Sequence, residues 1–202
     1  MDLIPSESQV REQLEQTGAL RPGHFRHSSG THSDLYLQIP LAMRYSGESK
    51  SLSVALSRKL RQDDAVRRAV PNVSVVVPAT GGLPIAFGVA EALQASQTYW
   101  AEKNDAGDLE LRQFVQIRPG EQVILVDDIL RTGRKLTQLR RLVEQAGAKV
   151  LALAVLVHQP FENCARFDDL PLFQLLRLEP HYWSAKDCPL CAQRVPVIEV
   201  GE

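Results

Sequence analysis

The sequence predicts an α/β fold in which a mostly parallel, twisted sheet is flanked by helices. Three short apolar runs, at residues 73–77, 123–126 and 150–157, consist largely of valine, leucine, isoleucine and alanine, as expected of strands buried on both faces. Stretches with apolar residues at helical spacing separate these runs. Strands that alternate with helices form parallel β-α-β units, and such sheets bind ligands at the carboxyl ends of their strands.

Length and composition indicate the class of protein. The chain has 202 residues, so we expect residues 1–202 to form a single domain with embellishments. Its net charge of −1 argues against a surface devoted to nucleic acid. No apolar run is long enough to span a membrane, and the first eleven residues lack the apolar core of a signal peptide. Three cysteines are too few for a disulfide framework, so we expect a cytoplasmic protein.

The first 45 residues predict a small hood segment ahead of the sheet. A short helix begins near Ser8, has Val10 and Leu14 on its apolar side and ends at Gly18. A polar stretch follows, and alternating apolar residues over 35–39 then predict a strand.

The middle of the chain alternates helices, strands and loops. Apolar residues at helical spacing predict a helix over 51–70, which Pro71 ends. The strand at 73–77 leads into a loop made of Ala79, Thr80, Gly81 and Gly82. The elements expected next are a helix over 85–93, a strand over 98–101, a charged mobile hairpin loop over 103–110, a returning strand over 114–117 and a turn at 119–120.

The last part of the chain contains one further helix and one further strand. The helix opens at Thr132 and Gly133 and ends before Gly147, and the strand covers 150–157. Residues 161–202 lack clear periodicity. We therefore expect them to form an irregular tail packed on the core instead of a second domain.

The most informative motif covers residues 123–135, with the sequence VILVDDILRTGRK. Its apolar strand leads to Asp127 and Asp128, which we expect at an exposed strand end. Carboxylates held there accept hydrogen bonds from ribose hydroxyls or hold a divalent cation. Other Asp-Asp pairs, at 63–64 and 168–169, are interpreted as solvated turns because no strand or helix start accompanies them.

A helix start directly after the carboxylates completes the motif. Gly133 lets backbone N–H groups converge on an anion, and the hydroxyl of Thr132 adds a donor. Five basic residues and no acidic residue lie between positions 131 and 141, which favours a negatively charged ligand. The combination indicates a phosphate-binding loop.

Four segments resemble the type I phosphoribosyltransferases and, more narrowly, the orotate phosphoribosyltransferases. Residues 123–133 are similar to the family's signature for phosphoribosyl pyrophosphate (PRPP), and residues 75–90 to its pyrophosphate loop. Residues 23–38 resemble its N-terminal segment, and residues 99–128 its flexible loop. The resemblance implies the family's fold and transfer of a phosphoribosyl group from PRPP to orotate, in pyrimidine biosynthesis. It also implies Mg²⁺ as cofactor and a homodimer whose mobile loop reaches the neighbouring site.

The resemblance assigns roles to residues of this chain. Asp127 and Asp128 would hold the ribose hydroxyls and Mg²⁺, the latter mostly through PRPP, and Lys103 would face the departing pyrophosphate. The residues implied to bind PRPP are Ala79, Thr80, Gly81, Gly82, Asp127, Asp128, Ile129, Leu130, Arg131, Thr132, Gly133, Arg134 and Lys135. Those assigned to the base are Arg26, Ser28, Arg131 and Gln159.

The base site departs from the family pattern. The family has a lysine where Ser28 aligns, and an arginine where Gln159 aligns, whereas Arg131 replaces a threonine. We expect Arg131 or Arg26 to bind the orotate carboxylate instead. Transfer to a different base, and a regulator that binds PRPP without turnover, remain as alternative functions.

The cysteines and histidines leave several alternatives open. Cys188 and Cys191 form a C-x-x-C pair, which would bind zinc together with Cys164 and either His181 or His158, act as a redox pair, or form a plain turn. We expect the plain turn, without zinc, because a second closely spaced pair of ligands is missing from the sequence. The clustered histidines at positions 24, 27 and 32 are interpreted as hydrogen-bonded loop residues.

Overall fold

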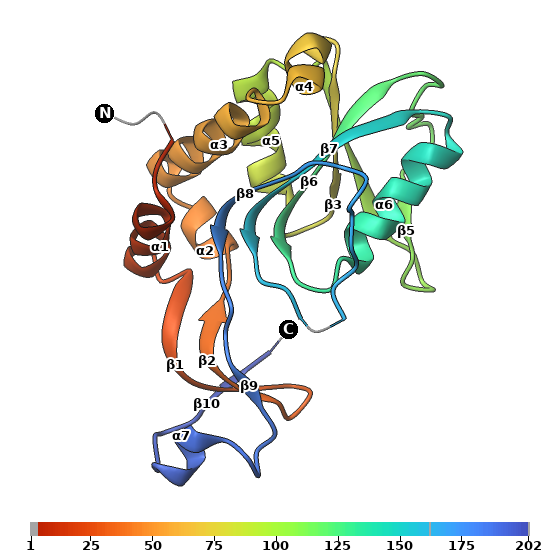
Figure 1. Cartoon of the computed structure of the whole chain (residues 1–202). Coiled ribbons are helices and arrows are strands. Elements are labelled where there is room, and N and C mark those ends of the chain that lie inside the picture. The colour runs from red at the N-terminus through yellow and green to blue at the C-terminus, as the bar shows by residue number, and fades with distance from the viewer. Residues whose placement is uncertain (1–3, 162, 202) are drawn as a thin grey trace.

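The computed structural model describes residues 4–161 and 163–201, which form a core sheet, its covering helices and a smaller hood sheet (Figure 1). The helices are α1 (Glu7–Gln16), α2 (Pro40–Met43), α3 (Ser46–Leu60), α4 (Asp64–Ala69), α5 (Leu83–Leu93), α6 (Arg134–Gln145) and α7 (Pro189–Ala192). The strands are β1 (Leu20–His27), β2 (His32–Leu37), β3 (Ser74–Pro78), β4 (Gln97–Lys103), β5 (Leu109–Leu111), β6 (Gln122–Leu130), β7 (Lys149–His158), β8 (Leu172–Arg177), β9 (Tyr182–Trp183) and β10 (Ile198–Val200). Within these ranges, no helix is both long and apolar enough to cross a membrane.

The core sheet has six strands in the order β5-β4-β3-β6-β7-β8. All neighbouring pairs are parallel except β4 and β5. Strands β3 and β7 are buried along almost their whole length, because their apolar side chains face helices or loops on both sides. This arrangement confirms the predicted fold class, and it brings the carboxyl ends of β3, β6 and β7 to one edge of the sheet.

Two apolar clusters hold the covering elements on the core sheet. On one face, helices α1, α3 and α5 bury side chains such as Leu14, Leu56 and Leu93. On the other face, α6 buries Leu139 and Val143 against β6 and β7. The amphipathic pattern of each helix therefore fixes which side of the sheet it covers.

The hood sheet joins the two ends of the chain in the order β10-β1-β2-β9. Strands β1 and β2 form an antiparallel hairpin, to which β10 adds in parallel and β9 in antiparallel orientation. Figure 1 shows this sheet and α7 extending beyond the carboxyl ends of the core strands. The stretch expected as a tail on the core is thus divided: β8 completes the core sheet, whereas β9, α7 and β10 belong to the hood.

Two predicted helices differ from the structure at their ends. Ser6, instead of Ser8, caps α1, because it forms a reciprocal capping box with Gln9. The helix expected over 51–70 is divided into α3 and α4, because the side chain of Asp63 accepts hydrogen bonds from the first N–H groups of α4.

The hairpin between β4 and β5 also differs from the prediction. Lys103 ends strand β4 and lies opposite Leu109, so it is outside the loop. The loop is short because the Asn104 side chain accepts hydrogen bonds from the backbone N–H groups of Ala106 and Asp108. The returning strand is β5, and residues 114–117 do not form one.

Candidate active site

A cavity of about 1310 Å³ lies where the carboxyl ends of the core strands meet the hood. The core contributes the end of β6 and the loop that leads into α6. The hood contributes the turn between β1 and β2 together with residues 180–184. The cavity is therefore built from segments at both ends of the sequence and from its middle.

Asp127 and Asp128 lie side by side in the wall of the cavity. Both are buried, with 2% and 8% of their surface exposed, and β6 continues past them to Leu130. The sequence interpretation of an exposed strand end is therefore wrong, because the ladder between β6 and β7 extends beyond the pair. Burial first, and the Asp128 carboxylate second, raise the pKa of Asp127 well above its ordinary value, although Lys135 opposes this shift.

The loop at residues 79–82 packs directly on these carboxylates. A Cβ atom added to Gly81 would lie 2.7 Å from Asp128 Oδ2, and one added to Gly82 would lie 2.8 Å from Asp127 Oδ1. Both distances are shorter than a real contact allows, so glycine is needed for the close approach. The structure thus brings together the two motifs that the sequence analysis treated separately.

The loop from Arg131 to Lys135 lines the cavity and opens α6. Gly133 has a φ of +75°, and a Cβ atom there would lie 2.7 Å from the Cβ of Ala165, so both backbone and space require glycine. The first residues of this twelve-residue helix line the cavity, so its N-terminal end, with unpaired backbone N–H groups, lies at the cavity wall. All predicted PRPP residues from 127 to 135 line this one cavity.

Arg131 is held between the core and the hood. Its Nε donates to Oε1 of Gln159 at 2.8 Å, and its Nη2 donates to the carbonyl oxygen of Leu37 at 3.3 Å. Gln159 is 1% exposed and is absent from the cavity wall, so it positions Arg131 from behind. These bonds use two of the five N–H donors of the guanidinium and fix its plane.

Aromatic side chains from the hood and from the loop after β7 line the cavity near Arg131. Tyr182 contacts Phe161 with ring centroids 4.7 Å apart and lies 6.0 Å from the ring of His27. Burial and the charge of Arg131 lower the pKa of His27, which favours a neutral imidazole. All three side chains line the cavity beside Ser28. The sequence analysis missed Phe161 and Tyr182 because they lie in the stretch without periodicity.

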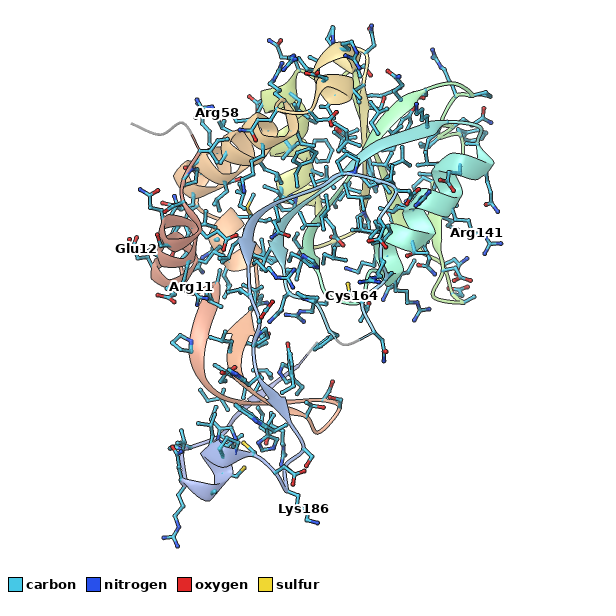
Figure 2. All side chains as sticks on the ribbon, viewed as in Figure 1. Arg11, Glu12, Arg58, Arg141, Cys164 and Lys186 are labelled. Carbon is cyan, nitrogen blue, oxygen red and sulfur yellow. The ribbon has the colours of Figure 1, made fainter. Side chains whose placement is uncertain are left out.

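Several predicted residues lie outside the cavity wall, among them all four residues of the loop at 79–82. Arg26 pairs with Glu199 of β10, with Nη2 and Oε1 2.6 Å apart, and half of its side chain is exposed. Lys103 is exposed at the end of β4. In the basic block of α6, Arg140 pairs with Asp169 and Glu144, and Arg141 lies on the outer side of the helix in Figure 2. Only the first part of that block therefore faces the cavity.

The cavity thus has three chemical regions. A helix start with basic side chains suits a phosphate, and two buried carboxylates beside a glycine loop suit hydroxyl groups or a divalent cation. A fixed guanidinium next to aromatic rings suits a flat ring that carries a negative charge. One ligand that joins a phosphate to a sugar, and a second that is planar and anionic, would fill the three regions together.

Comparisons with known proteins agree with this chemistry. Residues 55–190 match the family model described as Phosphoribosyl transferase domain. The orotate phosphoribosyltransferase of Carboxydothermus hydrogenoformans is 34% identical over 184 residues, which are 91% of each chain. That of Acidithiobacillus ferrooxidans is 35% identical over 178 residues, or 88% of each chain. A crystal structure of orotate phosphoribosyltransferase from Aeropyrum pernix has a TM-score of 0.66 and 23% identity, and the match covers 84% of this chain and 93% of that one.

Proposed function

The chain belongs to the orotate phosphoribosyltransferase family, and from this premise we propose how its residues divide the work of the reaction. The enzyme transfers the phosphoribosyl group of PRPP to orotate, which yields orotidine 5′-phosphate and pyrophosphate in pyrimidine biosynthesis. The observation that supports the division is the meeting of the carboxylate pair, the phosphate loop and Arg131 on one cavity.

The PRPP half of the site comprises the loop at 131–135, the carboxylate pair and the loop at 79–82. The N–H groups at the start of α6, with Thr132 and Lys135, bind the 5′-phosphate. Asp127 and Asp128 accept hydrogen bonds from the two ribose hydroxyls, which replaces the water that burial has removed from these carboxylates. The backbone of residues 79–82 then faces the pyrophosphate.

Magnesium fits the same carboxylate pair. Carboxylate oxygens are the ligands that Mg²⁺ prefers, and Mg²⁺ is commonly held by one or two carboxylates together with substrate phosphates. A cation beside Asp127 also offsets the electrostatic repulsion between the carboxylates of Asp127 and Asp128. Asp127 and Asp128 would therefore hold Mg²⁺, mostly through PRPP, and the ion supplies charge stabilisation for the departing pyrophosphate.

The orotate half of the site lies under the hood. Arg131 donates charge-assisted hydrogen bonds to the orotate carboxylate, while Phe161 and Tyr182 contact the ring faces. Ser28, at the turn of the hood hairpin, adds a polar contact from the opposite side. Gln159 and the carbonyl of Leu37 keep the guanidinium in place. Arg26 is disfavoured for this role because it pairs with Glu199 outside the cavity wall.

These positions account for the reaction without a covalent enzyme intermediate. A ring nitrogen of orotate forms a bond to C1 of the ribose as the bond from C1 to the pyrophosphate oxygen breaks. The bond electrons leave with pyrophosphate, so positive charge develops on the ribose ring. Two fixed carboxylates near that ring stabilise the charge. The chain's contribution is therefore positioning and electrostatics.

A panel of bases tests the assigned substrate. With PRPP and Mg²⁺, we expect turnover with orotate and a kcat/KM about 10- to 150-fold lower with uracil, because uracil lacks the carboxylate and forfeits a charge-assisted contact of about 1.5–3 kcal/mol. The measurement is steady-state release of pyrophosphate with orotate, uracil and purine bases. Equal use of uracil, or preference for a purine, would contradict the base assignment. Binding of PRPP without turnover on any base would instead identify a regulator.

We also propose a homodimer in the cytoplasm. Three free cysteines suit a reducing compartment. Lys103 lies outside the cavity of its own chain, at the exposed end of β4. Its assigned contact with pyrophosphate is therefore best made in the cavity of a neighbouring subunit. Phe87 and Trp100 are 49% and 38% exposed with their rings 6.1 Å apart, and an interface on this side would cover them.

Mixed dimers test whether Lys103 acts across the interface. Lys103→Ala and the double variant Asp127→Asn, Asp128→Asn would each have little activity alone. When equal amounts of the two variants are refolded together or exchange subunits, half of the dimers are mixed. In each mixed dimer, one site combines the wild-type Asp127 and Asp128 of one chain with the wild-type Lys103 of the other. We therefore expect about a quarter of the wild-type activity per chain. Size-exclusion chromatography with light scattering checks the dimer, and a mixture no more active than its parts would show that Lys103 does not act in trans.

A further inference from the structure

Four side chains converge inside the hood, away from the cavity. Two come from the hairpin of β1 and β2 and two from the turn of α7, more than 150 positions further along the chain. We call them the hood cluster: His24, His32, Cys188 and Cys191. Their nearest nitrogen and sulfur atoms all lie within 4.8 Å of one another. The plain-turn interpretation assumed that a second pair of ligands was missing, whereas the structure places two histidines beside the two cysteines.

The distances suit a single metal ion at the centre of the cluster. Cys188 Sγ lies 3.4 Å from His24 Nε2, and Cys191 Sγ lies 3.6 Å from the same atom and 3.4 Å from His32 Nδ1. With zinc bond lengths of about 2.0–2.1 Å to nitrogen and about 2.3 Å to sulfur, tetrahedral geometry puts sulfur and nitrogen about 3.5 Å apart. The two nitrogens are 2.7 Å apart and would separate by about 0.6 Å to reach the tetrahedral spacing.

Hydrogen bonds alone do not explain the arrangement. His24 Nε2 faces three polar atoms at once, one nitrogen and two sulfurs, although a ring nitrogen carries either one proton or one lone pair. The other nitrogen of this ring, Nδ1, is 2.8 Å from the carbonyl oxygen of Val195 and donates to it. That bond leaves the lone pair of Nε2 directed into the cluster, as is usual for histidines that bind metals.

The C-terminal part of the hood, residues 181–201, contributes no side chain to the apolar core. From residue 181 to residue 201, the only buried residue is Cys188, and none of these residues belongs to either apolar cluster of the protein. Small structural units of this kind commonly depend on a metal or on disulfides. Strands β9 and β10 contain two and three residues, so their backbone pairing gives little additional support.

We propose that the hood cluster binds one structural zinc ion. Two thiolates and two imidazoles select zinc among the common divalent ions, and four protein ligands complete its tetrahedral shell. The ion ties α7 to the hairpin of β1 and β2 and so holds the hood over the cavity. Because four protein side chains complete the shell and none of them lines the cavity, the ion's role is structural and it takes no direct part in the reaction.

Metal analysis of the purified protein tests the proposal directly. The chain is expressed without a histidine tag, purified under reducing conditions and examined by elemental analysis. We expect about one zinc per chain in the wild type and in Cys164→Ser, and less than a tenth of that in Cys188→Ser, Cys191→Ser. Cys164 is a matched control because it is a free cysteine away from the hood cluster. Figure 2 shows Cys164 beside the core, whereas Lys186, two residues before Cys188, lies at the far end of the hood.

Cobalt substitution keeps the test valid if the double variant does not fold. Zinc is removed from the wild-type protein with a chelator and Co²⁺ is added. Intense visible bands of tetrahedral cobalt, with thiolate-to-cobalt charge transfer in the near ultraviolet, are expected. We also expect the zinc-free protein to unfold at a lower temperature, and zinc to restore the original value. The proposal would be overturned if the wild-type protein contained no zinc and gave no tetrahedral cobalt spectrum. A disulfide between Cys188 and Cys191 in the wild-type protein would also overturn it.

Discussion

Replacing both carboxylates of the PRPP site, as Asp127→Asn and Asp128→Asn together, is expected to lower kcat/KM for PRPP by about 10²- to 10⁴-fold. Each carboxylate accepts a charge-assisted hydrogen bond from ribose, worth about 1.5–3 kcal/mol, and a tenfold loss corresponds to about 1.4 kcal/mol. Asparagine keeps the shape and one acceptor, so the loss measures the charges. Steady-state kinetics at varied PRPP, with orotate saturating, give this value.

The matched control is the pair Asp168→Asn, Asp169→Asn, which changes the same dipeptide at an exposed site. Asp169 pairs with Arg140 on the outer face of α6, so PRPP kinetics should stay within about twofold of the wild type. If the control lowers kcat/KM as much as the cavity variant, or the cavity variant behaves like the wild type, the assigned role of Asp127 and Asp128 is wrong.

Asp127→Asn is expected to lower activity without lowering the stability of the folded protein at pH 7. Because burial and Asp128 raise the pKa of Asp127, the folded state disfavours the ionised form that the unfolded chain adopts freely. The contribution of Asp127 to stability therefore falls as pH rises from the unfolded pKa of about 3.9 toward the higher folded value. Asp127→Asn removes this penalty, so it should melt no lower than the wild type at pH 7, and its advantage should disappear below about pH 4.

The sequence predicted the arrangement of the loop assigned to PRPP better than that of the residues assigned to the base. The PRPP loop lies in one continuous segment, where strand, carboxylates, glycine and helix follow in order, so local rules were enough to place it. The base half is assembled from residues far apart in the chain, such as Ser28, Arg131 and Tyr182. The pairing of β2 with β9 brings the last of these near the others, and periodicity does not encode that pairing.

The hood cluster shows the same limit for metal ligands. Spacing within the sequence revealed the C-x-x-C pair but suggested Cys164 and His181 or His158 as its partners. The structure instead places His24 and His32 beside the pair, and these histidines occupy adjacent strands of one hairpin, where cross-strand neighbours share a face. Because the polar stretch at 24–33 was not interpreted as strands, the shared face of these two histidines was not evident.

Arg131→Ala is expected to weaken the use of orotate far more than that of PRPP. Loss of a guanidinium contact with a carboxylate removes about 2–3 kcal/mol, so kcat/KM for orotate should fall by about 30- to 150-fold. KM for PRPP should change by less than about threefold, since the phosphate is bound by the start of α6. Activity with uracil should hardly change, because uracil has no carboxylate to lose. The orotate-to-uracil ratio therefore measures the carboxylate contact itself.

Two further arginine variants separate charge from geometry in this expectation. Arg26→Ala removes the same side chain outside the cavity and breaks only the exposed pair with Glu199, so orotate kinetics should stay within about twofold. Arg131→Lys keeps the charge but not the planar fork that Gln159 and Leu37 hold, and should recover only part of the loss. If Arg131→Ala impaired PRPP and orotate equally, Arg131 would act on the ribose or phosphate. If Arg26→Ala produced the orotate defect instead, the carboxylate would bind at the rim of the hood, and the pair with Glu199 would have to open when orotate binds.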